Sequence, residues 1–222
     1  MPASYLDVDG TIVRTNLVHP TLFYLLNQAS PGRTLSRLAG ALARAPMLAL
    51  AELRDRREFN VELFKLYHGM TEDRMMLLAD EAYEKVLRPA VYKDARELVR
   101  RCLDIGHDVV IVSGALDFLM HRLAKDLGAT HVIANRLEYA DGVATGRMIP
   151  PVVAGPMKAI LVREHAHAHG HHLDDCFAYS DSYSDVPMLS VVGHPSAVNP
   201  DTALTRLAHA HNWPILHLDR TP

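Results

Sequence analysis

The run Asp7-Val8-Asp9-Gly10-Thr11 holds the residues whose types and spacing are best suited to chemistry. It overlaps the end of an apolar segment, residues 4–8, which is predicted to be a strand. Residues two apart in an extended chain point to the same side, so Asp7 and Asp9 face one site. Their carboxylates repel each other unless a cation or a proton lies between them. Taken alone, such a pair is as consistent with ordinary loop chemistry or surface charge as it is with a functional site.

Three later segments also place polar side chains at the ends of predicted strands. Val112-Ser113-Gly114 closes a strand and opens a helix, so its serine hydroxyl and glycine amide would form an anion site at a helix N-terminus, unless the serine is only a cap. Lys158 is predicted in the first turn of a helix, where the macrodipole disfavours a cation. It therefore faces an anion or is a surface lysine. Asp181 and Asp185 add two carboxylates after another strand, or serve as a solvated aspartate and a cap.

The order of helices and strands predicts how these segments come together. After Pro89 helices alternate with strands, which is typical of a parallel sheet that binds ligands at the carboxyl ends of its strands. Residues 20–89 show only the spacing of amphipathic helices. We therefore predict an α/β fold, a doubly wound parallel sheet with an all-helical cap inserted after the first strand. The expected core domain is residues 1–18 and 89–222, and the expected cap is residues 19–88.

Three local patterns add detail. Asp141-Gly142 between two short alternating segments predicts a β-hairpin. The apolar stretch at residues 38–50 predicts a buried or interface helix, with contact to a membrane surface as the alternative. His165 and His169 lie four apart on a predicted helix, within a histidine-rich patch at residues 165–172, and could chelate a metal. A solvated helix end is the simpler interpretation, because no carboxylate or cysteine completes a site within the patch.

Composition narrows the classes of function. The 222 residues are 49% hydrophobic with a formal net charge of −3, which excludes wholesale disorder and removes the electrostatic footprint of a general nucleic-acid binder. Cys102 and Cys176 are the only cysteines, too few for a disulfide framework, and their scarcity fits a reducing compartment. No targeting segment or membrane-spanning stretch is visible, so we expect a cytoplasmic protein.

In order and context, the four polar segments resemble those of the haloacid dehalogenase (HAD) superfamily of phosphohydrolases, and more closely its phosphoserine phosphatase-like branch. The motifs span most of the chain, and their joint occurrence is specific although each alone is weak. The run Arg56-Arg57-Glu58-Phe59-Asn60 also looks like this branch. The resemblance implies a Rossmann-like core and identifies the helical segment as the cap of that branch.

The resemblance also implies a role for each polar residue. Asp7 would be the nucleophile that forms an aspartyl-phosphate, and Asp9 would protonate the leaving oxygen and later activate water. Lys158 would balance the charge of Asp7 and the phosphate. The phosphoryl group would be bound or oriented by Thr11, Ser113 and Gly114.

A magnesium ion is the implied cofactor. Its ligands would be the Asp7 carboxylate, the backbone carbonyl of Asp9 and the side chain of Asp181. Asp185 would hold a metal-bound water or Lys158. Magnesium prefers hard oxygen ligands and keeps several waters, which suits a site with few protein carboxylates.

The expected function is a Mg²⁺-dependent phosphomonoesterase acting on a small phosphorylated metabolite. The alternatives are a phosphotransferase or mutase of the same fold, and a regulatory binding module without catalysis. In the cap, Arg56 and Arg57 would meet an anionic substrate group, or form a solvated helix face. Glu58 and Glu62 could meet an amine, as in phosphoserine or histidinol phosphate. We expect no nucleic acid and no integral membrane contact; a homodimer through the cap is a further hypothesis.

Overall fold

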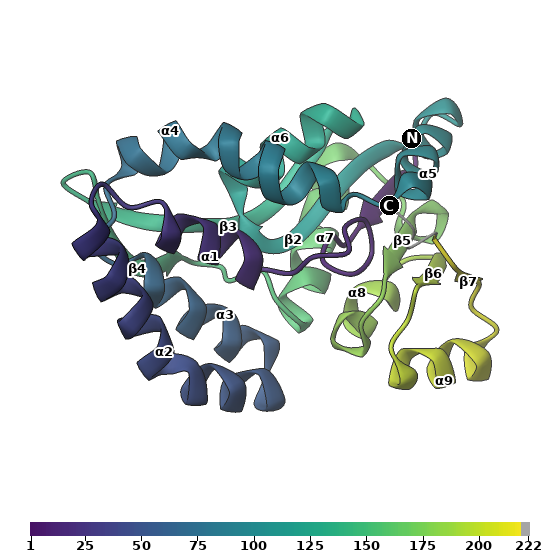
Figure 1. The fold of residues 1–222 in the computed structure, drawn as a ribbon. Coiled ribbons are helices and arrows are strands. Elements are labelled where there is room, and N and C mark those ends of the chain that lie inside the picture. The colour runs from purple at the N-terminus through teal and green to yellow at the C-terminus, as the bar shows by residue number, and fades with distance from the viewer. Residues whose placement is uncertain (219–222) are drawn as a thin grey trace.

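The computed structural model describes residues 1–218, so residues 219–222 of the expected core lie outside the described part. Strands and helices alternate over most of the chain (Figure 1). The strands are β1 (Ala3–Leu6), β2 (Asp108–Leu116), β3 (His131–Ala140), β4 (Val143–Ile149), β5 (Phe177–Ser180), β6 (His194–Val198) and β7 (Ile215–Leu216). The α-helices are α1 (Val18–Leu26), α2 (Pro31–Arg54), α3 (Arg56–Phe64), α4 (Glu72–Ala82), α5 (Lys93–Asp104), α6 (Asp117–Leu127), α7 (Pro156–His169), α8 (Val186–Leu189) and α9 (Thr202–His211).

The strands form one sheet in the order β4-β3-β2-β1-β5-β6-β7. Within the described chain every pairing is parallel except that of β3 with β4. Helices cover both faces: Ile111 packs with the buried residues of α5 and α6, whereas its neighbour Val110 packs with those of α7, α8 and α9. Burial on both faces explains why these strands are apolar throughout. The predicted α/β fold with a parallel sheet is confirmed.

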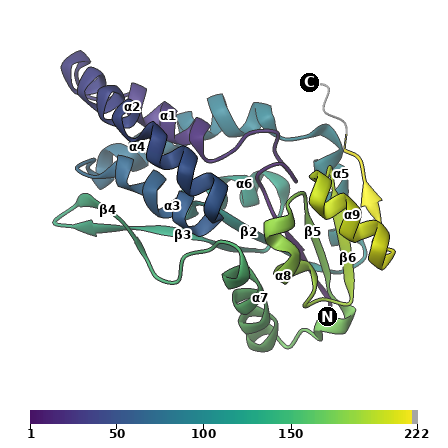
Figure 2. The same cartoon turned by 90° about the horizontal axis from the view of Figure 1, so that it is seen from below.

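Helices α1 to α4, which we call the helical block, lie to one side of the sheet (Figure 2). Their large buried side chains include Tyr24, Phe64 and Met75, and these belong to the same hydrophobic cluster as α5 and α6. The chain enters and leaves the block through paired segments: Arg14 N donates to Ala90 O at 2.9 Å. The block is therefore inserted after the first strand, and its entrance and exit lie side by side.

The predicted hairpin at Asp141-Gly142 is confirmed, with φ values of 50° and 71° at the two turn residues. It is longer than expected, because β3 continues from His131 to Ala140 as one strand. Its tip reaches the helical block, where Ala144 N donates to Met70 O at 2.8 Å. The block is thus attached to the core at a second place, which is the β3–β4 hairpin.

Two expectations about local structure are wrong. β2 does not end at Ser113: it continues to Leu116 through a register shift against β3, so no helix N-terminus lies at Ser113 and Gly114. The apolar stretch at residues 38–50 forms a helix as predicted, but this helix is not buried, and the alternative of an interface helix stays a prediction. The stretch is the middle of α2, in which Ala51 is the buried residue and Leu42 is 75% exposed. Within the described residues, no helix combines the length and the apolar character needed to cross a membrane.

Candidate active site

Lys158 lies between two carboxylates at the carboxyl edge of the sheet. Its Nζ donates to Asp7 Oδ1 at 2.5 Å and to Asp185 Oδ2 at 2.7 Å. The three side chains are at most 7% exposed. Asp7 follows β1, Asp185 follows β5 and Lys158 is in the first turn of α7. These elements meet because parallel strands end at the same edge of a sheet. Lys158 is therefore not a surface lysine: it faces the acidic cluster.

The hydroxyl of Thr11 connects the loops after β1 and β5. Its Oγ1 donates to Asp7 Oδ2 at 3.0 Å and accepts the backbone N–H of Asp181 at 2.9 Å. Thr11 is fully buried, and its turn is closed by the Val8 carbonyl, which accepts the amides of Thr11, Ile12 and Val13. Lys158 and Thr11 thus each hold one oxygen of Asp7, which fixes the plane of that carboxylate.

Gly10 is needed at its position for two reasons. Its φ of +84° is in the left-handed region that other residues rarely adopt. A Cβ there would lie 2.0 Å from Asp181 Oδ2, so a side chain would displace that carboxylate. The turn after β1 therefore packs directly against Asp181, and the two strand ends present their carboxylates to one small space.

Burial and mutual repulsion raise the pKa values of these carboxyls. Desolvation, followed by the charge of Asp7, raises the pKa of Asp9 to about 7. Desolvation and the charges of Asp7 and Asp185 raise the pKa of Asp181 to about 8. Burial also raises the pKa of Asp7, against the opposing effect of Lys158. Burial alone would lower the pKa of Lys158, but Asp185 and Asp7 more than offset it, so the pKa is raised and the ammonium stays charged.

The donor set fits a hard divalent cation. Asp7 and Asp181 offer carboxylate oxygens, and Gly10 keeps the backbone of the turn close to Asp181. Like charges raise the pKa of Asp181, and a bound cation would relieve that repulsion. Hard oxygen donors without nitrogen or sulfur are the set that Mg²⁺ prefers. Asp185 was also predicted to belong to the metal group. Its Oδ2 instead accepts hydrogen bonds from Lys158 and, at 2.8 Å, from the hydroxyl of Ser180.

Ser113 and Gly114 lie in β2 beside the helical block. Ser113 is fully buried and its Oγ accepts the backbone N–H of Ala115 at 3.0 Å. A Cβ on Gly114 would lie 2.6 Å from Nδ2 of Asn60, so α3 approaches the strand closely here. Asn60 is 1% exposed, and its Oδ1 has no hydrogen-bond partner.

Sequence reasoning quoted Asn60 only as part of a run and gave it no role. The signal that could have singled it out is its spacing from Leu63 and Phe64, which places a polar residue on the apolar face of α3. The sequence analysis likewise gave no role to Ser180, which supports Asp185. It is the last residue of β5.

The two predicted cap arginines lie in different surroundings. Arg56 is partly buried and lines a hollow of about 510 Å³ between the block and the core loops, together with Gly155 and Ser182. Burial lowers the pKa of Arg56, but Glu52 and then the carboxylates of Asp9, Asp7 and Asp181 raise it. Arg57 is exposed and lines another hollow with Met47 and Val61.

The two acidic residues predicted to meet an amine, Glu58 and Glu62, both line the hollow that contains Arg57, and none of the carboxylates around Lys158 is among its described lining residues. Glu62 pairs with Lys65 and lies 3.8 Å from Arg44. Glu58 is exposed and lines the same hollow as Arg57. Among the predicted cap residues, Arg56 is therefore the one whose charge interacts with the carboxylates of Asp7, Asp9 and Asp181.

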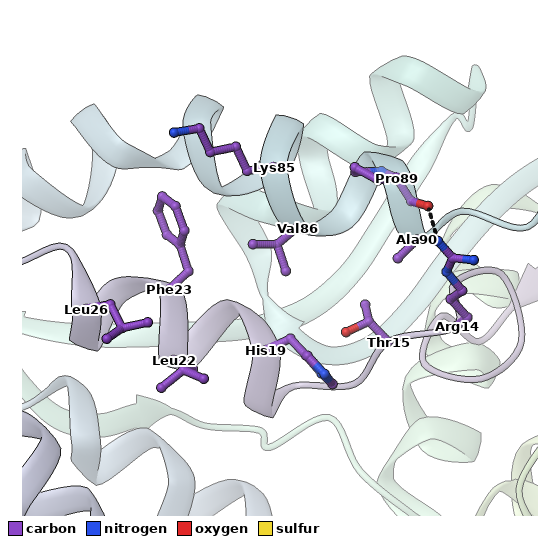
Figure 3. A pocket seen from close by; sticks show the side chains of 10 residues that line it. All are labelled: Arg14, Thr15, His19, Leu22, Phe23, Leu26, Lys85, Val86, Pro89 and Ala90. Atoms are coloured by element: carbon purple, nitrogen blue, oxygen red, sulfur yellow. Dashed lines mark hydrogen bonds between the residues drawn. The ribbon is translucent and has the colours of Figure 1, made fainter. Parts of the chain in front are cut away.

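A further hollow of about 510 Å³ lies between α1 and residues 85–90 (Figure 3). Leu22, Phe23 and Val86 line it, and Arg14 Nη2 closes one end by donating to Pro89 O at 3.1 Å. No carboxylate is among its described lining residues. It is therefore separate from the cluster around Asp7.

Comparisons with known proteins agree with this geometry. The family model for haloacid dehalogenase-like hydrolases matches residues 5–190. An inhibition of morphological differentiation protein from Streptomyces azureus is 36% identical over 98% of this chain and 79% of its own length. A phosphoserine phosphatase from Mycobacterium tuberculosis is 31% identical over 96% of this chain and 70% of its own length.

A crystal structure of phosphoserine phosphatase shares the fold, with a TM-score of 0.71 and 19% identity over 99% of this chain and 94% of that one. A second structure of phosphoserine phosphatase, with the same score, identity and coverage, is described as a phospho-aspartyl intermediate analogue. The chain therefore belongs to the haloacid dehalogenase-like hydrolase family, as an enzyme of its phosphoserine phosphatase-like branch.

Proposed function

We propose that this phosphatase is a Mg²⁺-dependent phosphomonoesterase that hydrolyses a small phosphorylated metabolite through a phosphoryl group carried on Asp7. The observation that carries this proposal is the buried Asp7 carboxylate, whose two oxygens are held by Lys158 and Thr11. A fixed carboxylate beside a cation is the arrangement that nucleophilic attack on a phosphate dianion requires. The phospho-aspartyl analogue described for phosphoserine phosphatase supports the same role here.

Asp9 is suited to move the proton. Its pKa of about 7 allows it to donate a proton to a leaving alkoxide and then to accept one from water near neutral pH. Its side chain is partly exposed, unlike that of Asp7, so it can reach substrate and solvent. Asp7 and Asp9 thus divide attack and proton transfer between them.

Lys158, from α7 of the core, and Arg56, from α3 of the helical block, supply positive charge. Lys158 opposes the effect of burial on the pKa of Asp7 and would neutralise part of the phosphate charge, and Asp185 with Ser180 holds the lysine in place. Arg56 faces the same carboxylates from α3 and would bind an anionic group of the substrate. Thr11, whose hydroxyl is occupied and buried, acts by positioning Asp7 and Asp181.

Mg²⁺, when bound, would withdraw charge from the phosphoryl oxygens and so reduce their repulsion of Asp7. Asp7, Asp181 and the backbone carbonyl of Asp9 would hold it. Residues 19–88, which contain most of the helical block, would act as the cap over this edge of the sheet. Ser113 and Gly114, near the C-terminal end of β2, would border the phosphoryl group from the core side.

The experiment is a screen of phosphorylated metabolites, with phosphoserine and histidinol phosphate included, for release of inorganic phosphate. We expect release from at least one ester with Mg²⁺, none with excess EDTA, and none from Asp7→Asn, because an amide is a poor nucleophile. A phosphotransferase would consume the ester but release phosphate only when its acceptor is absent. Full turnover by Asp7→Asn or in EDTA would contradict the proposal.

A further inference from the structure

Three histidines gather at the edge of the sheet opposite the catalytic residues. His131 is the first residue of β3, and His165 and His169 lie in the last turns of α7. Lys158, in the first turn of α7, is eleven residues before His169, which corresponds to about 16 Å along a helix. The cluster is therefore separate from the Asp7 site and plays no part in the function proposed above.

The three side chains are close enough to share one ion. Each offers a ligand atom, and these atoms all lie within 4.8 Å of one another. The ring centroids of His165 and His169 are 4.1 Å apart, and His131 lies 4.8 Å and 4.5 Å from them. Nitrogens bound tetrahedrally at about 2.0–2.1 Å from Zn²⁺ are roughly 3.3 Å apart, so small rotations of these side chains would complete the site.

Hydrogen bonds at the other ring nitrogens leave donor atoms free. His165 Nδ1 bonds to the hydroxyl of Tyr5 at 3.2 Å, while its Nε2 is buried without a partner. His169 Nδ1 lies 2.9 Å from the backbone carbonyl of His165, to which it donates, so its Nε2 carries the lone pair. Metal-bound histidines typically have this arrangement, in which the second nitrogen bonds to an oxygen and orients the ring.

Neutral rings are needed for such packing. Burial, and then the neighbouring His169, His131 and His171, lower the pKa of His165 to about 4. His171 flanks the cluster, with its ring 5.8 Å from that of His165, and its Nδ1 bonds to the Met1 carbonyl at 2.6 Å. Nε2 of His165 is thus a buried nitrogen without a hydrogen-bond partner, a cost that a cation bound to it would remove.

We propose that His131, His165 and His169 form a binding site for one borderline transition-metal ion of the Zn²⁺ class, with solvent as a further ligand. Imidazole suits Zn²⁺, Ni²⁺ and Co²⁺, whereas Mg²⁺ prefers oxygen, so the two sites of the molecule select different metals. The ion would join the start of β3 to the end of α7. It would therefore stabilise the folded state by mass action.

The test is calorimetric titration of untagged, metal-stripped protein with ZnCl₂ in saturating Mg²⁺, which occupies the carboxylate site. We expect one Zn²⁺ per chain, and binding weaker by about 100-fold or more in His131→Gln and in His169→Gln. His167→Gln is the matched control, because this exposed histidine lies on the same helix outside the cluster. Asp181→Asn should bind Zn²⁺ as the wild type does.

A second measurement does not depend on variants: Co²⁺ added to the wild-type protein should give the visible absorption of a four-coordinate nitrogen site at one equivalent. The absence of this spectrum would overturn the proposal. Undiminished Zn²⁺ binding in His131→Gln would also overturn it, because the ion would then be bound only by the two histidines on α7. Equal losses in His167→Gln and His169→Gln, or loss in Asp181→Asn, would also overturn it.

Discussion

Lys158 is a single buried cation between two buried carboxylates, and removing it should affect turnover far more than a surface lysine would. We expect Lys158→Ala to lower kcat by about 100-fold or more, the scale of losing one preorganised charge. It should also lower the melting temperature, because Asp7 and Asp185 lose their shared partner. Lys125→Ala is the control, since Lys125 is exposed on α6. Near-normal kcat in a folded Lys158→Ala protein would contradict the role given to this lysine.

Asp9 differs from Asp7 in what its loss should do. Asp9→Asn cannot donate a proton to an alkoxide, so an ordinary metabolite should stall at the first step. p-Nitrophenyl phosphate has a leaving group that needs no proton, and its first step should survive while water attack still lacks a base. We expect a burst of about one equivalent of nitrophenol and a phosphoenzyme seen by intact-mass spectrometry.

Peptide mapping should place this phosphoryl group on Asp7. A phosphoryl group on Ser113 or on a histidine would show that the nucleophile is another residue. Wild-type turnover of a metabolite by Asp9→Asn would show that the proton is moved by a different group.

The raised carboxyl pKa values make the stability of the metal-free protein depend on pH. Unfolded aspartates titrate near about 4, whereas the pKa is about 7 for Asp9 and about 8 for Asp181 in the folded protein. Between these values the two carboxyls bind more protons in the native state than in the unfolded state, so their contribution to the free energy of unfolding falls as pH rises from about 4 to about 8.

Urea unfolding in EDTA at several pH values measures this effect. Asp181→Asn should flatten the dependence, and Mg²⁺ should stabilise the wild-type protein more at pH 8 than at pH 5, because the ion competes with protons for these carboxylates. An Asp181→Asn protein whose stability in EDTA shows the same pH dependence as the wild type would contradict the assignment.

At the scale of elements, the turn after β1 must pack against the loop after β5. Gly10→Ala would place a Cβ 2.0 Å from Asp181 Oδ2, and we expect activity at limiting Mg²⁺ to fall at least tenfold, about the effect of disturbing a metal's surroundings. Gly106→Ala is a matched control: Gly106 has a similar φ of +80° and no atom within 4 Å of its Cβ. Both variants should lose stability through backbone strain, but only Gly10→Ala should require more Mg²⁺.

The sequence patterns that predicted the structure correctly are those whose physical cause lies within a few residues. The helix that begins at Pro156 and the turn at Asp141-Gly142 follow from a helix-start signal and from turn geometry, and both are found where predicted. β2 was predicted too short, because Ser113-Gly114 is typical of a strand end. In the structure, the side-chain amide of Asn135, on the neighbouring strand β3, donates to Gly114 O at 2.8 Å. This hydrogen bond holds the segment extended.

Contacts between distant segments could not be predicted. Asn60 approaches Gly114 only because α3 folds over the end of β2, and no spacing along the chain encodes that distance. His131 joins His165 and His169 for the same reason, since β3 begins beside the end of α7. The sequence showed the pair on one helix, but the third histidine required the fold.

For the whole molecule, the outer surface of α2 bears on the predicted homodimer. Leu42 is 75% exposed and Leu53 is 85% exposed, and both lie on α2 together with other partly exposed apolar residues. If copies associate through the helical block, Leu42→Glu with Leu53→Glu should give a monomer in sedimentation velocity while kcat stays unchanged. The exposed Leu77 on α4 provides the control substitution. A wild-type protein that sediments as a monomer would contradict the dimer hypothesis.

The helical block is joined to the rest of the chain at two separate places, near Arg14 and Ala90 and again near Met70 and Ala144. It also packs against the core: its buried side chains share a hydrophobic cluster with α5 and α6, and Arg122 of α6 donates to Asp80 of α4. On α3, Arg56 lies beside Gly155 and Ser182. A movement of α3 that widens this hollow for a substrate would therefore also carry Arg56 away from the carboxylates, because the arginine lies on that helix. Substrate entry and assembly of the charged site would then be coupled.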